Sequence, residues 1–111
     1  MMMITVLLLG ALVSVGSIEK GDAIVAAQIE LLKLSFFCDD PLYRSKRNRV
    51  IETIAELKGV TSFSEKTVTA LDDALKNKTV RLATPINRGD CMALISEAQE
   101  AVDALYGPAA K

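Results

Sequence analysis

The chain has 111 residues, of which 13 are basic, 14 are acidic and half are hydrophobic. This length suits one small domain, and the balanced charge on an apolar background excludes a disordered chain, an acidic tail and a basic nucleic-acid-binding module. The sequence contains no His and only two Cys. The lack of His removes the usual general base, the usual zinc ligand and the Ser/His and Cys/His catalytic pairs.

The N-terminal segment is the most apolar part of the chain. Thirteen of the first 18 residues are Met, Ile, Val, Leu or Ala, and none is charged. The apolar run from Ile4 to Val15 spans 12 residues. That length fits the roughly 7–15 residues of a secretory hydrophobic region better than the roughly 20 residues of a membrane-spanning helix.

These features predict a signal peptide over residues 1–23, followed by a single helical domain over residues 24–111. Small residues at three positions permit cleavage after Gly16, Ser17 or Ala23. Two alternatives stay open, since no Lys or Arg precedes the apolar run. The segment could stay uncleaved as an anchor, which would be the chain's only membrane contact, or it could be an N-terminal core helix.

The two cysteines, Cys38 and Cys91, predict one disulfide. An even number of Cys behind a signal-like segment is typical of an exported domain. Closing a loop of roughly 50 residues restricts the unfolded chain by roughly 4 kcal/mol in the chain-entropy model. We therefore expect a periplasmic or secreted protein. The alternative is a cytosolic protein with two buried thiols.

Helical periodicity and end signals indicate an all-α fold, a small bundle of about four short helices with one disulfide. Asp40 is the predicted N-cap of the second helix and Gly59 its stop signal. Ser62 and Glu65 have capping-box spacing before the third helix, and Asp90 is the predicted N-cap of the fourth. The expected helices cover residues 23–37, 41–58, 62 or 64 to 76, and 91–106.

The first of these helices carries two apolar faces. They are separated by Gln28 and Ser35 on one side and by Glu30 and Lys33 on the other. Each of the two apolar faces must be buried against another helix. This helix is therefore either the exchanged element of a homodimer formed through helix 24–37, or the central helix of a monomeric bundle. The faces consist of Val25, Ile29, Leu32 and Phe36, and of Ile24, Ala27, Leu31 and Leu34.

A basic cluster on the second helix is the candidate partner-binding surface. Arg47 is its unusual member, because it lies on the apolar stripe rather than opposite it. One interpretation is a cationic patch that contacts an anionic partner surface. The other is a solvated helix face with Arg47 extending its charge into water. The candidate residues are Tyr43, Arg44, Lys46, Arg47 and Arg49.

Motifs that carry chemistry are missing from the sequence. There is no glycine-rich phosphate loop, no nucleophile elbow and no metalloprotease signature. Asp39 and Asp40 are explained by capping, and Asp72 and Asp73 by a solvated helix face, because adjacent residues on a helix point in different directions. We expect no enzyme, no cofactor, no metal and no nucleic-acid partner.

A Cys leading into one helix and a second Cys leading into another, on a short exported chain, resembles the layout of small periplasmic acid-stress chaperones of bacteria. The resemblance rests on Cys38 and Cys91 with the helices that follow them. Our main expectation is a non-enzymatic protein-binding domain of the periplasm or cell envelope, such as an accessory, inhibitor or immunity-type factor of a secretion or conjugation system. The alternatives are a periplasmic acid-stress chaperone and a membrane-anchored envelope peptide or toxin.

Overall fold

The computed structural model describes the backbone of residues 2–82 and 86–106, and the side chains within these ranges from residue 18 onward. Within them the fold is entirely helical, as the sequence predicts. The helices are α1 (Met2–Phe37), α2 (Tyr43–Glu56), α3 (Glu65–Lys76) and α4 (Cys91–Tyr106), with a short 3₁₀ turn, η1 (Arg88–Asp90), leading into α4.

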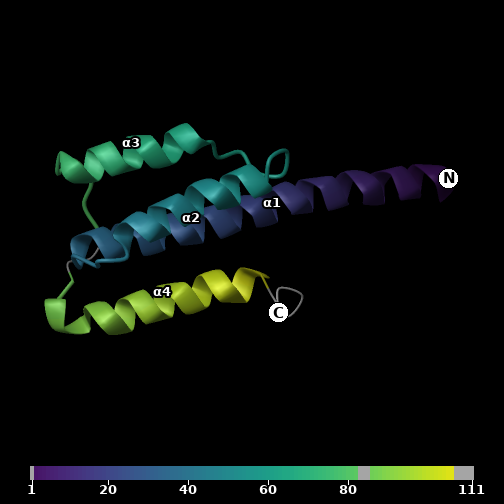
Figure 1. Ribbon diagram of the computed structural model, residues 1–111. Helices are drawn as coiled ribbons and strands as arrows, with labels where there is room; N and C mark the ends of the chain where they lie inside the picture. Colours follow the sequence, from purple (N-terminus) through teal and green to yellow (C-terminus); the bar gives the residue numbers. More distant parts are fainter. Residues whose placement is uncertain (1, 83–85, 107–111) are drawn as a thin grey trace.

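Helix α1 is the central helix and contacts the other three α-helices (Figure 1). Helix α2 packs along one side of α1, α3 lies over α2, and α4 packs along another side of α1. The N-terminal part of α1 extends beyond the other helices, which gives the molecule dimensions of 58 × 28 × 25 Å. Residues 2–23 of the predicted leader (residues 1–23) are therefore continuous with the helix that follows, although the side chains up to residue 17 lie outside the described residues. Among the described residues, no helix combines the length and the hydropathy needed to cross a membrane.

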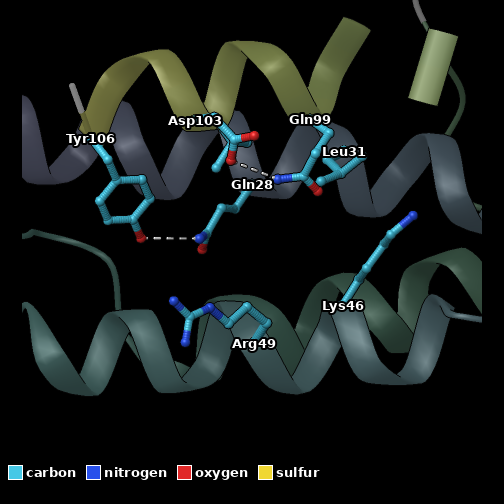
Figure 2. A pocket seen from close by; sticks show the side chains of 8 residues that line it. Gln28, Leu31, Lys46, Arg49, Gln99, Asp103 and Tyr106 are labelled. Carbon is cyan, nitrogen blue, oxygen red and sulfur yellow. Dashed lines mark hydrogen bonds between the residues drawn. The ribbon is translucent and has the colours of Figure 1, made fainter. Parts of the chain in front are cut away.

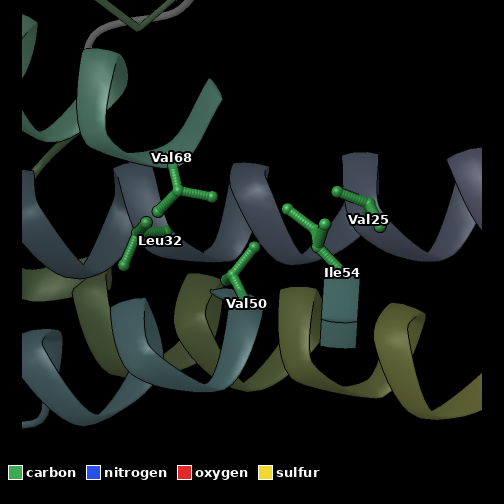
Figure 3. Packing of buried hydrophobic residues seen from close by; sticks show 5 residues of the cluster. All are labelled: Val25, Leu32, Val50, Ile54 and Val68. Carbon is green, nitrogen blue, oxygen red and sulfur yellow. The ribbon is translucent and has the colours of Figure 1, made fainter. Parts of the chain in front are cut away.

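The main core joins α1, α2 and α3. Its buried members are Val25 and Leu32 from α1, Val50 and Ile54 from α2, and Val68 from α3 (Figure 3). Burying a Val, Leu or Ile side chain stabilises the folded state by about 1.5–3 kcal/mol. These contacts therefore hold the three helices together.

A second buried layer lies between α1 and α4. Helix α1 buries Ile24 and Leu31 on this side, and α4 buries Cys91 and Val102. Both apolar faces of α1 are thus covered by helices of its own chain, which matches the central-helix alternative. An exchanged homodimer would bury the same faces, so the dimer through helix 24–37 stays a prediction.

The helix ends follow the predicted signals with small shifts. Asp40 is not the N-cap residue of α2. Its Oδ1 instead accepts a hydrogen bond from the Leu42 N–H at 2.9 Å, in the turn before the helix. The capping box of α3 consists of Ser64 and Thr67 rather than Ser62 and Glu65. Helix α2 ends at Glu56 with Leu57 as its C-cap residue, two residues before the predicted end, and Gly59 with φ +91° lies in the turn that follows.

The predicted disulfide between Cys38 and Cys91 is confirmed. Its Cα atoms are 5.8 Å apart, within the usual range for bridged cysteines. The bond ties the junction of α1 and α2 to the first residue of α4. Disulfides persist in oxidising compartments, so this bond indicates a location outside the cytoplasm.

Candidate functional site

A groove runs between α4 and α2 with the turn before it, and α1 forms its floor at the end near Gln28. It consists of two neighbouring hollows that share Lys46 from α2 and Gln99 from α4 in their walls. The two helices lie on either side of α1 in this region (Figure 2). The groove is the candidate functional site because one of its ends is mainly apolar and the other is polar and charged.

The apolar end of the groove lies beside the disulfide. It is a hollow of about 700 Å³. Its apolar lining consists of Pro41, Leu42, Met92, Ile95 and the two bridged cysteines, and its polar lining of Asp39, Asp40, Lys46, Ser96, Gln99 and Glu100. Leu42 is 57% exposed and Met92 is 86% exposed. Two large apolar side chains exposed at the same hollow give it an apolar rim, and Met adapts its shape to different partners. The disulfide holds both walls of this hollow in place.

The polar end of the groove centres on Gln28 and is about 160 Å³ in volume. Gln28 is 5% exposed. Its Nε2 donates hydrogen bonds to Thr53 Oγ1 at 3.1 Å and to Tyr106 Oη at 3.4 Å. Its Oε1 accepts no hydrogen bond from the described residues. An unsatisfied buried acceptor costs about 1–3 kcal/mol, so the Gln28 amide is only partly satisfied by the described residues.

Charged side chains surround the Gln28 amide. Arg49 extends from α2 on the side of the groove opposite Tyr106 (Figure 2). Its guanidinium lies 3.8 Å from Glu52, with 57% of the side chain exposed, so most of its hydrogen-bonding capacity faces water. On the α4 wall, Asp103 accepts a hydrogen bond from Gln99 Nε2 at 3.0 Å. The α2 wall therefore offers a cation and the α4 wall an acceptor.

The residues of the predicted basic cluster do not form one surface. Tyr43 and Arg47 point toward α3, where both bond the carboxylate of Asp72. Lys46 and Arg49 line the groove, and Lys46 also donates a hydrogen bond to Asp40. Arg44 is exposed. The unusual position of Arg47 is thus explained by a bond between helices.

Asp72 is buried, which corrects the expectation that it lies on a solvated face. It is 7% exposed and ties α3 to α2. Its oxygens accept from Tyr43 Oη at 2.5 Å and from Arg47 Nη1 at 3.5 Å, and Lys76 Nζ lies 2.9 Å away. Burial alone raises the pKa of Asp72, but the hydrogen bonds from Tyr43 and Lys76 and the nearby cations outweigh it and hold the pKa below its ordinary value. Burial and the same hydrogen bond raise the pKa of Tyr43.

Two further carboxylates also have lowered pKa values. Partial burial raises the pKa of Asp40, but the hydrogen bonds from Lys46 and the Leu42 N–H outweigh it and keep the pKa low. Hydrogen bonds from the Ser62 and Thr61 hydroxyls and from the Ser62 N–H lower the pKa of Asp22. Each of these bonds is made to the charged form, which is therefore the stable form in the folded protein.

The residues that define the groove were not candidates in the sequence analysis. The sequence contains a signal for Gln28, because this polar residue lies between two apolar helix faces that both have to be covered by other helices. Met92 and Leu42 carry no such signal, because an isolated apolar residue at the end of a helix is common on protein surfaces. Within the described part of the chain, no three His, Cys, Asp or Glu side chains gather as a metal site.

Comparisons with known proteins identify no relative. No protein-family model matches the chain, and neither a curated protein nor a solved structure shows significant similarity to it.

Proposed function

We propose that this protein is a non-enzymatic, exported protein-binding domain of the periplasm or cell envelope, and that the groove between α2 and α4 receives a segment of its partner. The observation that carries the proposal is the apolar hollow beside the disulfide, where Leu42 and Met92 are exposed. The disulfide supports the compartment, because it requires an oxidising environment.

The chemistry of the groove describes the partner segment. Its apolar side chains would contact Leu42, Met92 and Ile95 at the wide end. At the narrow end, a carboxylate or carbonyl would face Arg49. A short amphipathic segment combines these groups, as in other cases where a peptide fills a groove between helices.

A photo-crosslinking amino acid at position 92 tests the proposal. We expect it to capture one specific protein in the native envelope, because Met92 lies at the mouth of the apolar hollow. The matched control is Thr69, an exposed position on α3 away from the groove. Leu42→Glu in the same crosslinking chain should lower capture by at least about tenfold, since a lost Leu contact is worth about 1.5–3 kcal/mol.

Folding is checked in parallel by circular dichroism. Leu42 is exposed, so Leu42→Glu should change the free energy of unfolding by no more than about 0.5 kcal/mol. Equal capture from positions 92 and 69, or capture that survives Leu42→Glu, would reject the groove as the binding site.

A second candidate function, a chaperone active at low pH, is favoured by the three carboxylates with lowered pKa values. Asp72 ties α3 to α2, Asp40 braces the turn before α2, and Asp22 bonds the loop after α2. The pKa values of these carboxyl groups are lower in the folded protein than in the unfolded chain, where they are close to 3.8. The charged carboxylates therefore stabilise the folded protein fully above the unfolded pKa, and this stabilisation is lost as the pH falls through the folded pKa values. Protonation would then release α3 and expose the core around Val68.

Urea denaturation over a pH series tests this second candidate. We expect the free energy of unfolding to be nearly constant from neutral pH to about pH 5 and to fall below about pH 4. Asp72→Asn should be less stable at neutral pH and should lose less on acidification. A chaperone must also suppress the aggregation of a client protein at low pH and not at neutral pH. Failure to suppress aggregation at any pH would exclude the chaperone while leaving the groove proposal intact.

A further inference from the structure

The start of the folded domain is marked by a close contact between α1 and the loop that joins α2 to α3. Gly21 is buried against this loop, and a Cβ atom added at position 21 would overlap the carbonyl oxygen of Val60. Only glycine allows the two backbone segments to approach this closely. Residue 21 is therefore an integral part of the domain, although it lies within the predicted leader.

Asp22 strengthens the same contact. Its Oδ1 accepts hydrogen bonds from Thr61 Oγ1 and from the Ser62 N–H, both at 2.6 Å, and its Oδ2 accepts from Ser62 Oγ at 2.6 Å. One carboxylate thus satisfies three donors of the loop. We call Gly21 and Asp22, with the loop residues Val60, Thr61 and Ser62, the Gly21–Asp22 contact.

This contact bears on where a leader can be removed. Cleavage after Ala23 would delete both Gly21 and Asp22 and leave three loop donors without their acceptor. It would also place the new ammonium group on Ile24, which is 5% exposed and precedes the fully buried Val25. Burying an ammonium group without a charged partner is costly. The domain therefore disfavours cleavage after Ala23.

We infer that the leader is removed by hydrolysis of the Gly16–Ser17 peptide bond, so that the mature chain begins at Ser17; this rests on the proposed export. Water adds across the bond, Gly16 leaving with the new carboxylate and Ser17 keeping the new amino group. Of the two predicted sites ahead of Gly21, only this one has small residues at both the first and third positions before the cut, Gly16 and Ser14.

N-terminal sequencing and intact mass of the exported protein, expressed from the full chain in a bacterium with a periplasm, test the inference. A chain beginning at Ser17 supports it. A chain beginning at Ile18 or at Ile24 overturns it but leaves export standing. An intact Met1 with the disulfide formed also overturns the inference, but is consistent with an exported protein whose N-terminal segment stays uncleaved as an anchor. An intact Met1 with two free thiols overturns export itself.

A second measurement tests the Gly21–Asp22 contact independently of processing. Asp22→Ala in the full chain should accelerate amide hydrogen exchange at Ser62 by about tenfold or more, because the Ser62 N–H loses a charged acceptor. Glu19→Ala is the matched control, since Glu19 is an exposed carboxylate on the same helix. Unchanged exchange at Ser62 in Asp22→Ala would show that the contact does not hold the loop, and would remove the basis for rejecting cleavage after Ala23.

Discussion

Replacing Cys38 and Cys91 together by Ser is expected to lower the free energy of unfolding by about 4 kcal/mol, the chain-entropy value for a closed loop of roughly 50 residues. The effect is large because a small domain has a total stability of only about 5–15 kcal/mol. The bond also joins the junction of α1 and α2 to the first residue of α4, so its loss frees α4 at that end. Urea denaturation of the oxidised protein and of the double variant measures the difference.

The matched control for this prediction is Arg88→Ala. Arg88 is exposed, lies three residues before Cys91 and pairs with Asp39, whose Oδ2 is 2.6 Å from Arg88 Nη2. An exposed ion pair of this kind contributes about 0–1 kcal/mol, so the control should remain close to the parent protein. A loss of less than about 1 kcal/mol in the double Ser variant would show that packing alone holds α4 in place.

Leu32→Ala is expected to destabilise the protein by about 2–5 kcal/mol, the usual range for removing a buried Leu side chain. Leu32 has no exposed surface and belongs to the cluster that joins α1 to α2 and α3. Leu32 is packed among three helices, so the neighbouring side chains can fill the cavity left by the substitution only in part. Thermal or urea unfolding gives the change in free energy.

Leu42→Ala provides the comparison for Leu32→Ala, because it removes the same atoms from a side chain that is 57% exposed. We expect it to change stability by no more than about 0.5 kcal/mol. Equal effects of the two substitutions would contradict the assignment of α1 as the central helix. Measuring the midpoint at several protein concentrations also tests the exchanged homodimer, whose unfolding would depend on concentration.

The overall fold was predictable because its determinants are local. The apolar periodicity and the Gly and Pro positions locate α2, α3 and α4 to within a few residues, and two cysteines allow only one intramolecular pairing. The start of α1 was not located, because the helix was expected from residue 23 and begins at Met2. The N-caps were less accurate. Ser62 has the spacing of a capping residue, but its hydroxyl donates a hydrogen bond to Asp22, 40 residues away in sequence. Ser64 is the N-cap residue of α3 instead.

The candidate site was not predictable, because it depends on contacts between distant residues. Asp72 has the sequence context of a surface residue, and only the approach of α2, with Tyr43 and Arg47, makes its burial stable. Gln28 lies at the boundary of two apolar faces, and the sequence does not reveal that α2 and α4 cover both while leaving its Oε1 unpaired. A helical pattern shows which residues share a face, but not which neighbour that face meets.

The oxidation state of the two cysteines in the native protein tests the account most directly, since the compartment, the position of α4 and the shape of the groove all depend on the bond between them. Alkylation of the denatured protein followed by mass spectrometry counts the free thiols. We predict no labelled cysteine without reductant and both Cys38 and Cys91 labelled after reduction. Labelling of both cysteines in protein that was never reduced would contradict the account.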